Sequence, residues 1–159
     1  MAELKDVVAY LCHHYPHKHE LSKARLTKMV YLADWRSAIT RKCQVTNIVW
    51  QFNHFGPYVD DVVELARHDP AFQVNKGWTM YGDEKELIQL IAPLTATSLT
   101  NEEQGILDFV IDSTRSKYWD DFIRLVYSTY PIVSQPRFAT LDLITLAKEY
   151  VGEERPVSD

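Results

Sequence analysis

The chain has 159 residues, of which 46% are apolar and 25% charged, and its formal net charge is −5. This length suits one domain with a sizeable core, and the apolar fraction excludes an intrinsically disordered protein. The acidic balance and the dispersed Lys and Arg residues disfavour a protein that holds phosphate backbones, so nucleic acid is not expected as a partner. Aromatic residues, at 12%, exceed what a minimal core requires and favour a protein interface.

The cysteines and the N-terminus indicate a cytoplasmic protein. Cys12 and Cys43 both fall in segments of regular pattern, so we expect free thiols in a reducing compartment. A helical pattern begins directly after Met1, which argues against a secretory leader. Since no apolar run reaches the ~18 residues that a membrane span requires, no membrane partner is expected.

The first half of the chain predicts three helices and a strand. Apolar residues at helical spacing predict one helix from residue 4 to just before Pro16, and a second from its cap at Ser22 to about residue 40. Residues 45–52 are rich in β-branched and aromatic side chains and predict a strand. Gly56 then allows a sharp turn, and Pro57 suits the first position of a helix that ends near residue 69.

The second half predicts further strands and helices. Residues 71–92 predict short antiparallel strands with turns at 75–77 and 82–83, which we expect to form one small sheet with the strand at 45–52. Thr100 and Glu103 have the spacing of a capping box that opens a helix. Another helix is expected from Ser116 to before Tyr130-Pro131, and a last one capped by Thr140.

The predicted fold class is therefore α+β, a mainly helical single domain with a small antiparallel sheet. We expect this domain to span residues 1–152 and a polar tail to follow at 153–159.

The histidines at 13, 14, 17 and 19 are the main pattern with catalytic potential. His13 and His17 are four residues apart, a spacing that on one helix face can hold zinc. However, Pro16 lies between them and should end the helix, and no carboxylate has the spacing to complete a ligand set. We therefore expect no catalytic residue, no metal and no cofactor; a histidine-centred metal-dependent enzyme is the alternative.

Two segments resemble a known family. The segment K-M-V-Y-L-A-D at residues 28–34 resembles the K-L-x-Y-x-A-D motif of the Panacea-domain (SocA-like) antitoxins, which include phage-associated, GepA-like proteins. The segment W-Q-F-N-H-F-G-P at residues 50–57 matches their W-x-F-x-x-x-G-P motif. Many members carry a Gly shortly after the first motif, where this chain has Arg41-Lys42-Cys43, so we expect a connection of a different shape.

The resemblance implies a cytosolic bacterial or phage protein, without enzymatic activity, that neutralises a toxin encoded beside it by direct binding. Some relatives resemble adaptors that deliver a toxin to a protease, which makes a protease a further candidate partner. A nucleic-acid-binding regulator is the remaining alternative.

We expect the toxin-binding surface to lie on these two motif segments, because aromatic groups beside a charge are typical of binding hot spots. Its predicted residues are Tyr31, Asp34, His54, Phe55 and Tyr58. The competing interpretation assigns Tyr31 and Tyr58 to the core, and makes Asp34 a solvent-facing group near Arg36 or Arg41. A structural role in shaping the motifs is expected for Lys28, Trp50, Gly56 and Pro57.

Overall fold

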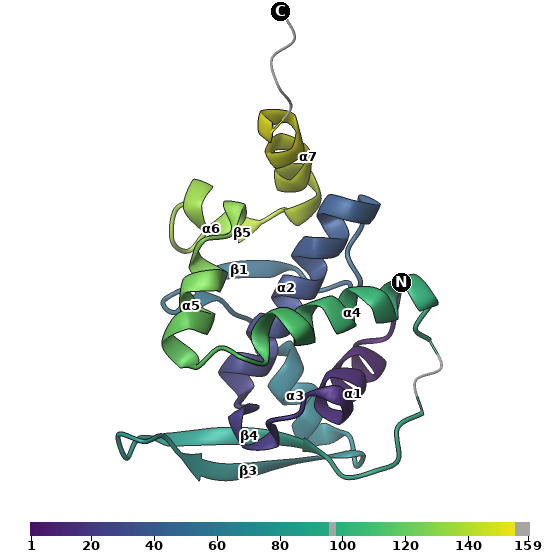
Figure 1. The fold of residues 1–159 in the computed structure, drawn as a ribbon, viewed down its shortest axis with the longest axis vertical. Coiled ribbons are helices and arrows are strands. Elements are labelled where there is room, and N and C mark those ends of the chain that lie inside the picture. Colours follow the sequence, from purple (N-terminus) through teal and green to yellow (C-terminus); the bar gives the residue numbers. More distant parts are fainter. Residues whose placement is uncertain (96–97, 155–159) are drawn as a thin grey trace, which may run out of the picture.

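The computed structural model describes residues 1–95 and 98–154 and has the predicted mainly helical α+β fold (Figure 1). The first half contains helix α1 (Leu4–His14), the 3₁₀ turn η1 (Lys18–Glu20), helix α2 (Lys23–Arg41), strands β1 (Trp50–Asn53) and β2 (Gly56–Pro57), and helix α3 (Asp61–His68). The second half contains strands β3 (Phe72–Trp78) and β4 (Glu84–Leu90), helices α4 (Asn101–Thr114), α5 (Trp119–Tyr127) and α6 (Tyr130–Ser134), strand β5 (Thr140–Leu141) and helix α7 (Leu143–Glu154). Within these ranges, no helix has the length and apolar character needed to cross a membrane.

Helix α2 forms the centre of the fold and packs against α1, α3, α4, α7 and β4 (Figure 1). Because neighbours surround it, its residues from Arg25 to Trp35 are all buried, instead of one stripe facing a core. The Ser22 hydroxyl caps the helix by accepting a hydrogen bond from the Arg25 N–H at 3.1 Å. Lys42 ends it with a φ of 63°, the left-handed conformation that Gly favours at a helix C-terminus.

Arg25 joins α2 to the segment between α4 and α5. Its Nη2 donates hydrogen bonds to the carbonyl oxygens of Thr114 at 2.9 Å and Lys117 at 2.8 Å, and the guanidinium lies 4.4 Å from the centre of the Phe122 ring. A cation suits the Thr114 carbonyl because it lies at the negative end of the α4 dipole. This buried cation therefore ties the segment between α4 and α5 to α2.

Two separate sheets accompany the helices, whereas the sequence analysis predicted one. Strand β1 pairs antiparallel with β2 on one side and β5 on the other, and β3 and β4 form their own hairpin. Residues 75–77 lie inside β3, so the turn predicted there is wrong, and the chain turns at 79–83. The Leu87 side chain packs closely over Gly77, since a Cβ there would lie 2.8 Å from Leu87 Cδ1 and that side chain would have to shift.

Several predicted boundaries need correction. The strand predicted at 45–52 begins only at Trp50, and Pro57 lies in β2, four residues before α3 starts at Asp61. Tyr130-Pro131 opens α6 instead of ending a helix, since proline is compatible with a first helical turn. Asp142, not Thr140, caps α7: its Oδ1 accepts from the Thr145 N–H at 3.1 Å.

Other predictions are confirmed. Helices α1 and α2 lie where the apolar spacing placed them. The Thr100 hydroxyl accepts from the Glu103 N–H at 3.1 Å while the Glu103 carboxylate accepts from the Thr100 N–H at 2.9 Å, which completes the capping box. Helix α7 runs to Glu154, and residues 155–159 of the predicted tail lie outside the described part. The division at residue 152 stays a prediction.

Candidate partner-binding site

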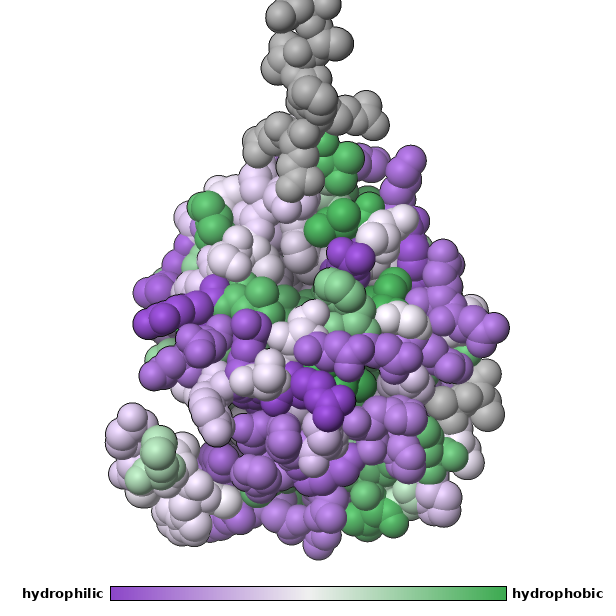
Figure 2. Space-filling model, viewed as in Figure 1, coloured by the Kyte–Doolittle hydropathy of each residue, from purple (hydrophilic) through white to green (hydrophobic). Residues whose placement is uncertain are grey.

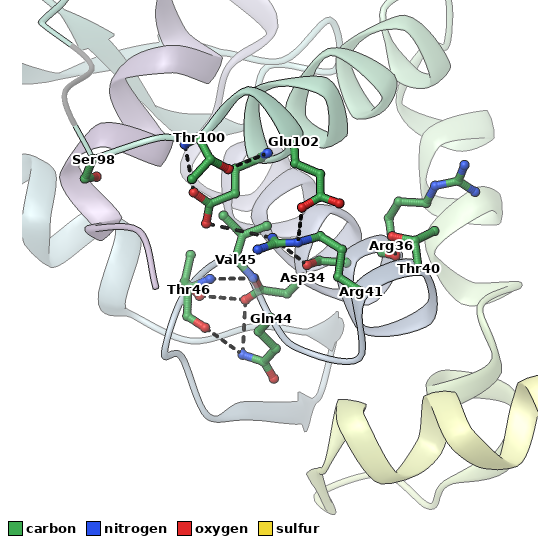
Figure 3. A network of polar contacts seen from close by, with 12 residues as sticks. Asp34, Arg36, Thr40, Arg41, Gln44, Val45, Thr46, Ser98, Thr100 and Glu102 are labelled. Atoms are coloured by element: carbon green, nitrogen blue, oxygen red, sulfur yellow. Dashed lines mark hydrogen bonds and ion pairs between the residues drawn. The ribbon is translucent and has the colours of Figure 1, made fainter.

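The carboxylate of Asp34 organises the connection between α2 and β1 (Figure 3). Its Oδ1 accepts hydrogen bonds from the N–H groups of Val45 and Thr46, each at 2.9 Å. Its Oδ2 accepts from Thr46 Oγ1 at 2.6 Å, Trp50 Nε1 at 2.9 Å and Gln44 Nε2 at 3.3 Å. The amides of Val45 and Thr46 are thereby unavailable to a strand at 45–49, which is consistent with β1 starting only at Trp50.

Asp34 is fully buried, so the expectation that it lies on a partner surface is wrong. Burial raises the pKa of this carboxyl to about 6, while the donors from Thr46, Trp50 and Val45 act in the opposite direction. The solvent-facing alternative is also wrong. Arg36 stacks on the Phe109 ring at 4.1 Å and Arg41 pairs with Glu102 at 3.5 Å.

Tyr31 is also fully buried, so in this structure it is part of the core and does not reach the surface. Its ring lies edge-on to Trp50, with the ring centres 5.5 Å apart, and its hydroxyl lies 2.8 Å from Thr129 Oγ1. The competing interpretation of this residue as core packing is therefore correct. Because Thr129 lies between α5 and α6, Tyr31 connects α2 to that segment.

Lys28 and Tyr58 lie between the core and the surface. The Lys28 side chain is buried, and its Nζ lies 5.5 Å from the centre of the half-buried Tyr58 ring. Burial lowers the pKa of the Lys28 ammonium to about 8 and raises the pKa of the Tyr58 phenol to about 12. Lys28 is therefore packed beneath Tyr58, and Tyr58 is only partly covered; the structural role of Lys28 and the partner role of Tyr58 stay predictions.

Gly56 and Pro57 form β2, which follows the tight turn after β1. Gly56 has a φ of 96°, which L side chains rarely adopt, and a Cβ there would lie 3.2 Å from the Tyr127 ring. Asn53 pairs with Gly56 and Phe52 with Pro57, so the chain reverses tightly and leaves only positions 54 and 55 at the tip.

The exposed part of the corner is aromatic. Phe55 is 80% exposed, and His54 is exposed beside it. The His54 ring lies edge-on to Phe138, with the ring centres 4.9 Å apart, and Phe138 is itself 60% exposed. We refer to His54, Phe55 and Phe138 as the aromatic corner.

Phe138 was not among the predicted surface residues, because no motif surrounds it. The segment 136–139 is held against β1 because the Phe138 N–H donates to the Phe52 carbonyl at 2.6 Å and the Phe52 N–H to the Ala139 carbonyl at 2.9 Å. Phe138 has a φ of 73°, which is rare for a bulky residue, and its side chain is largely exposed.

The family model described as "Antitoxin SocA-like, Panacea domain" matches residues 26–131, two thirds of the chain. The chain belongs to this family. Neither the curated proteins nor the solved structures contain a significant match.

Both motifs of this Panacea domain lie in the matched range, and they meet where Trp50 donates to Asp34. The family points to a protein partner such as a toxin and to a role that is not enzymatic. Phe138 lies beyond the matched range, although it completes the aromatic corner.

The histidines of the enzymatic alternative do not form a ligand set in the structure. Helix α1 ends at His14, before His17, and all four side chains at 13, 14, 17 and 19 are exposed. The described residues contain no group of three or more His, Cys, Asp or Glu able to hold a metal ion. Burial raises the pKa of the Cys12 thiol to about 12, which keeps that thiol protonated and unreactive.

Proposed function

We propose that this Panacea-domain protein neutralises a toxin by binding it directly through the aromatic corner. The observation that carries the proposal is the close pairing of exposed aromatic rings, His54 with Phe138, next to the 80% exposed Phe55. Such side chains give large contact areas while few rotors lose freedom, which is why they are enriched at interfaces.

The arrangement of the corner supports this role. Its backbone is fixed by the β1–β2 pairing and by Tyr127 against Gly56, so the main chain that carries the exposed rings does not have to be ordered on binding. Asp34 and Tyr31 support the corner from the core, because both contact Trp50 and so hold β1 in place. Tyr58 extends the proposed surface on its half-exposed side.

Rescue from the toxin encoded beside this gene tests the proposal. The toxin is expressed with wild-type protein, with Phe55→Ser or with Phe138→Ser, and growth is compared with the melting temperature of each purified variant. We expect both variants to lose rescue while the melting temperature changes little, since exposed side chains contribute little to folding stability.

Tyr118→Ser is the matched control. Tyr118 is 81% exposed, as much as Phe55. It lies away from the corner, because it precedes α5 and the corner is contacted by Tyr127 at the other end of that helix. Serine also suits the N-cap position that Tyr118 occupies. Equal loss of rescue in all three variants would show that general surface apolarity matters and the corner does not. The cytoplasmic location and the protease-adaptor role stay predictions of the family resemblance.

A further inference from the structure

The β3–β4 hairpin extends from the body of the molecule with one free edge (Figure 1). Strand β4 contacts the body of the molecule on its outer side, where the Ile88 N–H donates to the Leu21 carbonyl at 3.0 Å. Strand β3 is the outer strand, and no further strand pairs with it in the described part of the chain. An uncovered strand of seven residues is a template for another strand.

The hydrogen-bond pattern shows which backbone groups of β3 face this free edge. Ile88 points its N–H away from β3, and Ile88 is paired with Val74. Val74 therefore points its own N–H and C=O away from β4, and so do Lys76 and Trp78 at alternate positions. Among the described residues, none bonds to the backbone groups of these three.

The hairpin also exposes apolar side chains at both of its ends. Trp78 is 64%, Met80 90% and Tyr81 84% exposed at the tip, which forms the lobe at the lower left of Figure 2. At the base, Ile91 is more than half exposed next to Ala71. By contrast, the charges along the hairpin are paired within the molecule: Lys76 with Glu84 at 3.5 Å, and Glu86 with Lys23 at 3.2 Å.

We propose that two copies of this protein associate through β3, antiparallel and related by a two-fold axis at Asn75. An antiparallel pair of identical edges closes on itself and leaves no free edge. This register pairs all seven residues of β3. Val74 lies opposite Lys76 of the second copy, so the backbone N–H and C=O groups that point away from β4 in each copy can bond to each other. A register shifted to place the axis at Lys76 would set two like charges directly opposite each other.

The pairing also matches the apolar ends of the hairpin. In this antiparallel register, the hairpin tip of one copy lies beyond Phe72 of the other copy, next to the base of its hairpin. Trp78, Met80 and Tyr81 of the tip then lie near the exposed Ile91 of that base. A buried aromatic side chain contributes roughly 150–250 Å². Two aromatic residues, Met80, Ile91 and the strand itself therefore approach the about 800 Å² per partner of a stable interface.

A register-specific crosslink tests the arrangement in the full chain with Cys43 replaced by Ser. Asn75→Cys places two thiols opposite each other at a non-hydrogen-bonded pair, where Cα atoms are about 4.5 Å apart and a disulfide fits. Gln73→Cys places the two thiols four residues apart along the paired strands. This offset of roughly 13 Å is too long for a disulfide. We expect mild oxidation to give a covalent dimer with Asn75→Cys and little with Gln73→Cys. Equal crosslinking, or none, would overturn the proposal.

Sedimentation equilibrium from low micromolar to near-millimolar concentration gives the second measurement. We expect wild-type protein to reach twice the monomer mass, and Lys76→Pro to remain monomeric with its hairpin intact, because proline removes only an outward-facing N–H. Lys76→Thr loses the same charge but keeps the N–H, and should still dimerise. A wild type that stays monomeric throughout, or a Lys76→Pro variant that dimerises normally, would contradict pairing through β3.

Discussion

The indole Nε1 of Trp50 donates a hydrogen bond of 2.9 Å to Oδ2 of Asp34, and this bond connects the two sequence motifs of the family. The acceptor lies in the middle of α2, and the donor is the first residue of β1. The other side-chain and backbone donors to the carboxylate belong to the loop between them, at Gln44, Val45 and Thr46. One side chain thus fixes the path of the chain from the central helix to the corner.

Asp34→Asn should lower the free energy of unfolding by roughly 1–3 kcal/mol, because the new amide would place a donor against the Trp50 N–H and leave buried groups unpaired. Urea denaturation measures the change. Asp112→Asn, a matched change at an exposed position of α4, should stay within about 0.5 kcal/mol of wild type. A wild-type midpoint for Asp34→Asn would mean that the loop does not depend on the carboxylate charge.

Lys28→Met should remove a pH dependence of stability in the alkaline range. The pKa of Lys28 is lowered from 10.5 to about 8 by burial, so between these values the unfolded chain binds more protons than the folded one. The free energy of unfolding of wild type should therefore rise with pH from about 8 to about 10.4, by roughly 2–3 kcal/mol relative to Lys28→Met.

At pH 7, the charged form of Lys28 is buried against the Tyr58 ring with no carboxylate paired to it among the described residues, so the Met variant should be the more stable protein. Denaturation curves of both proteins across this pH range provide the comparison. A stability difference that does not vary with pH would show that Lys28 keeps its ordinary pKa in the folded state.

Gly56→Ala should destabilise the protein by about 1–3 kcal/mol, since alanine at a φ of 96° is strained and its Cβ would press on Tyr127. Gly105→Ala offers a control of opposite sign. Gly105 lies in helix α4, and a Cβ at that position would meet nothing within 4 Å, so alanine there should stabilise by roughly 0.5–1 kcal/mol. Thermal unfolding that moves in the same direction for both would refute the assignment of strain to Gly56.

Lys42→Gly should raise stability by roughly 0.5–1 kcal/mol, because glycine adopts the left-handed conformation at the end of α2 without the steric cost that lysine has. Lys42→Ala removes the same charge but keeps a Cβ, so it should not stabilise. Chemical denaturation of the two variants separates the backbone effect from the charge effect, and equal gains in both would favour the charge.

Local patterns predicted the fold class and the main helices, because their signals are contained in short stretches of sequence. The Thr100–Glu103 capping box and the apolar spacing of α1 are examples. The prediction of a strand at 45–49 was wrong for a non-local reason. Its β-branched residues favour a strand, but a carboxylate eleven residues earlier takes the amide of Val45.

Among the residues predicted to contact a partner, His54 and Phe55 are exposed, whereas Tyr31 and Asp34 are buried. His54 and Phe55 lie on the surface because a tight turn has no room to bury them. Asp34 and Tyr31 were wrongly predicted to be exposed. Helical spacing separates a buried face from an exposed face, but α2 is surrounded by neighbours and buries residues on every face here. Phe138 could not be found, since its place beside His54 depends on strand pairing between residues far apart in sequence.

The burial of the first motif has a consequence for how relatives of this protein are recognised. A sequence signature whose Lys, Tyr and Asp all face inward identifies the scaffold and carries no information about the target. Two proteins that share it can therefore display unrelated loops at residues equivalent to 54–55 and 136–139 and still fold alike. Under the toxin-binding role proposed for the aromatic corner, those outward positions, which the signature leaves unspecified, are where the choice of toxin would be encoded.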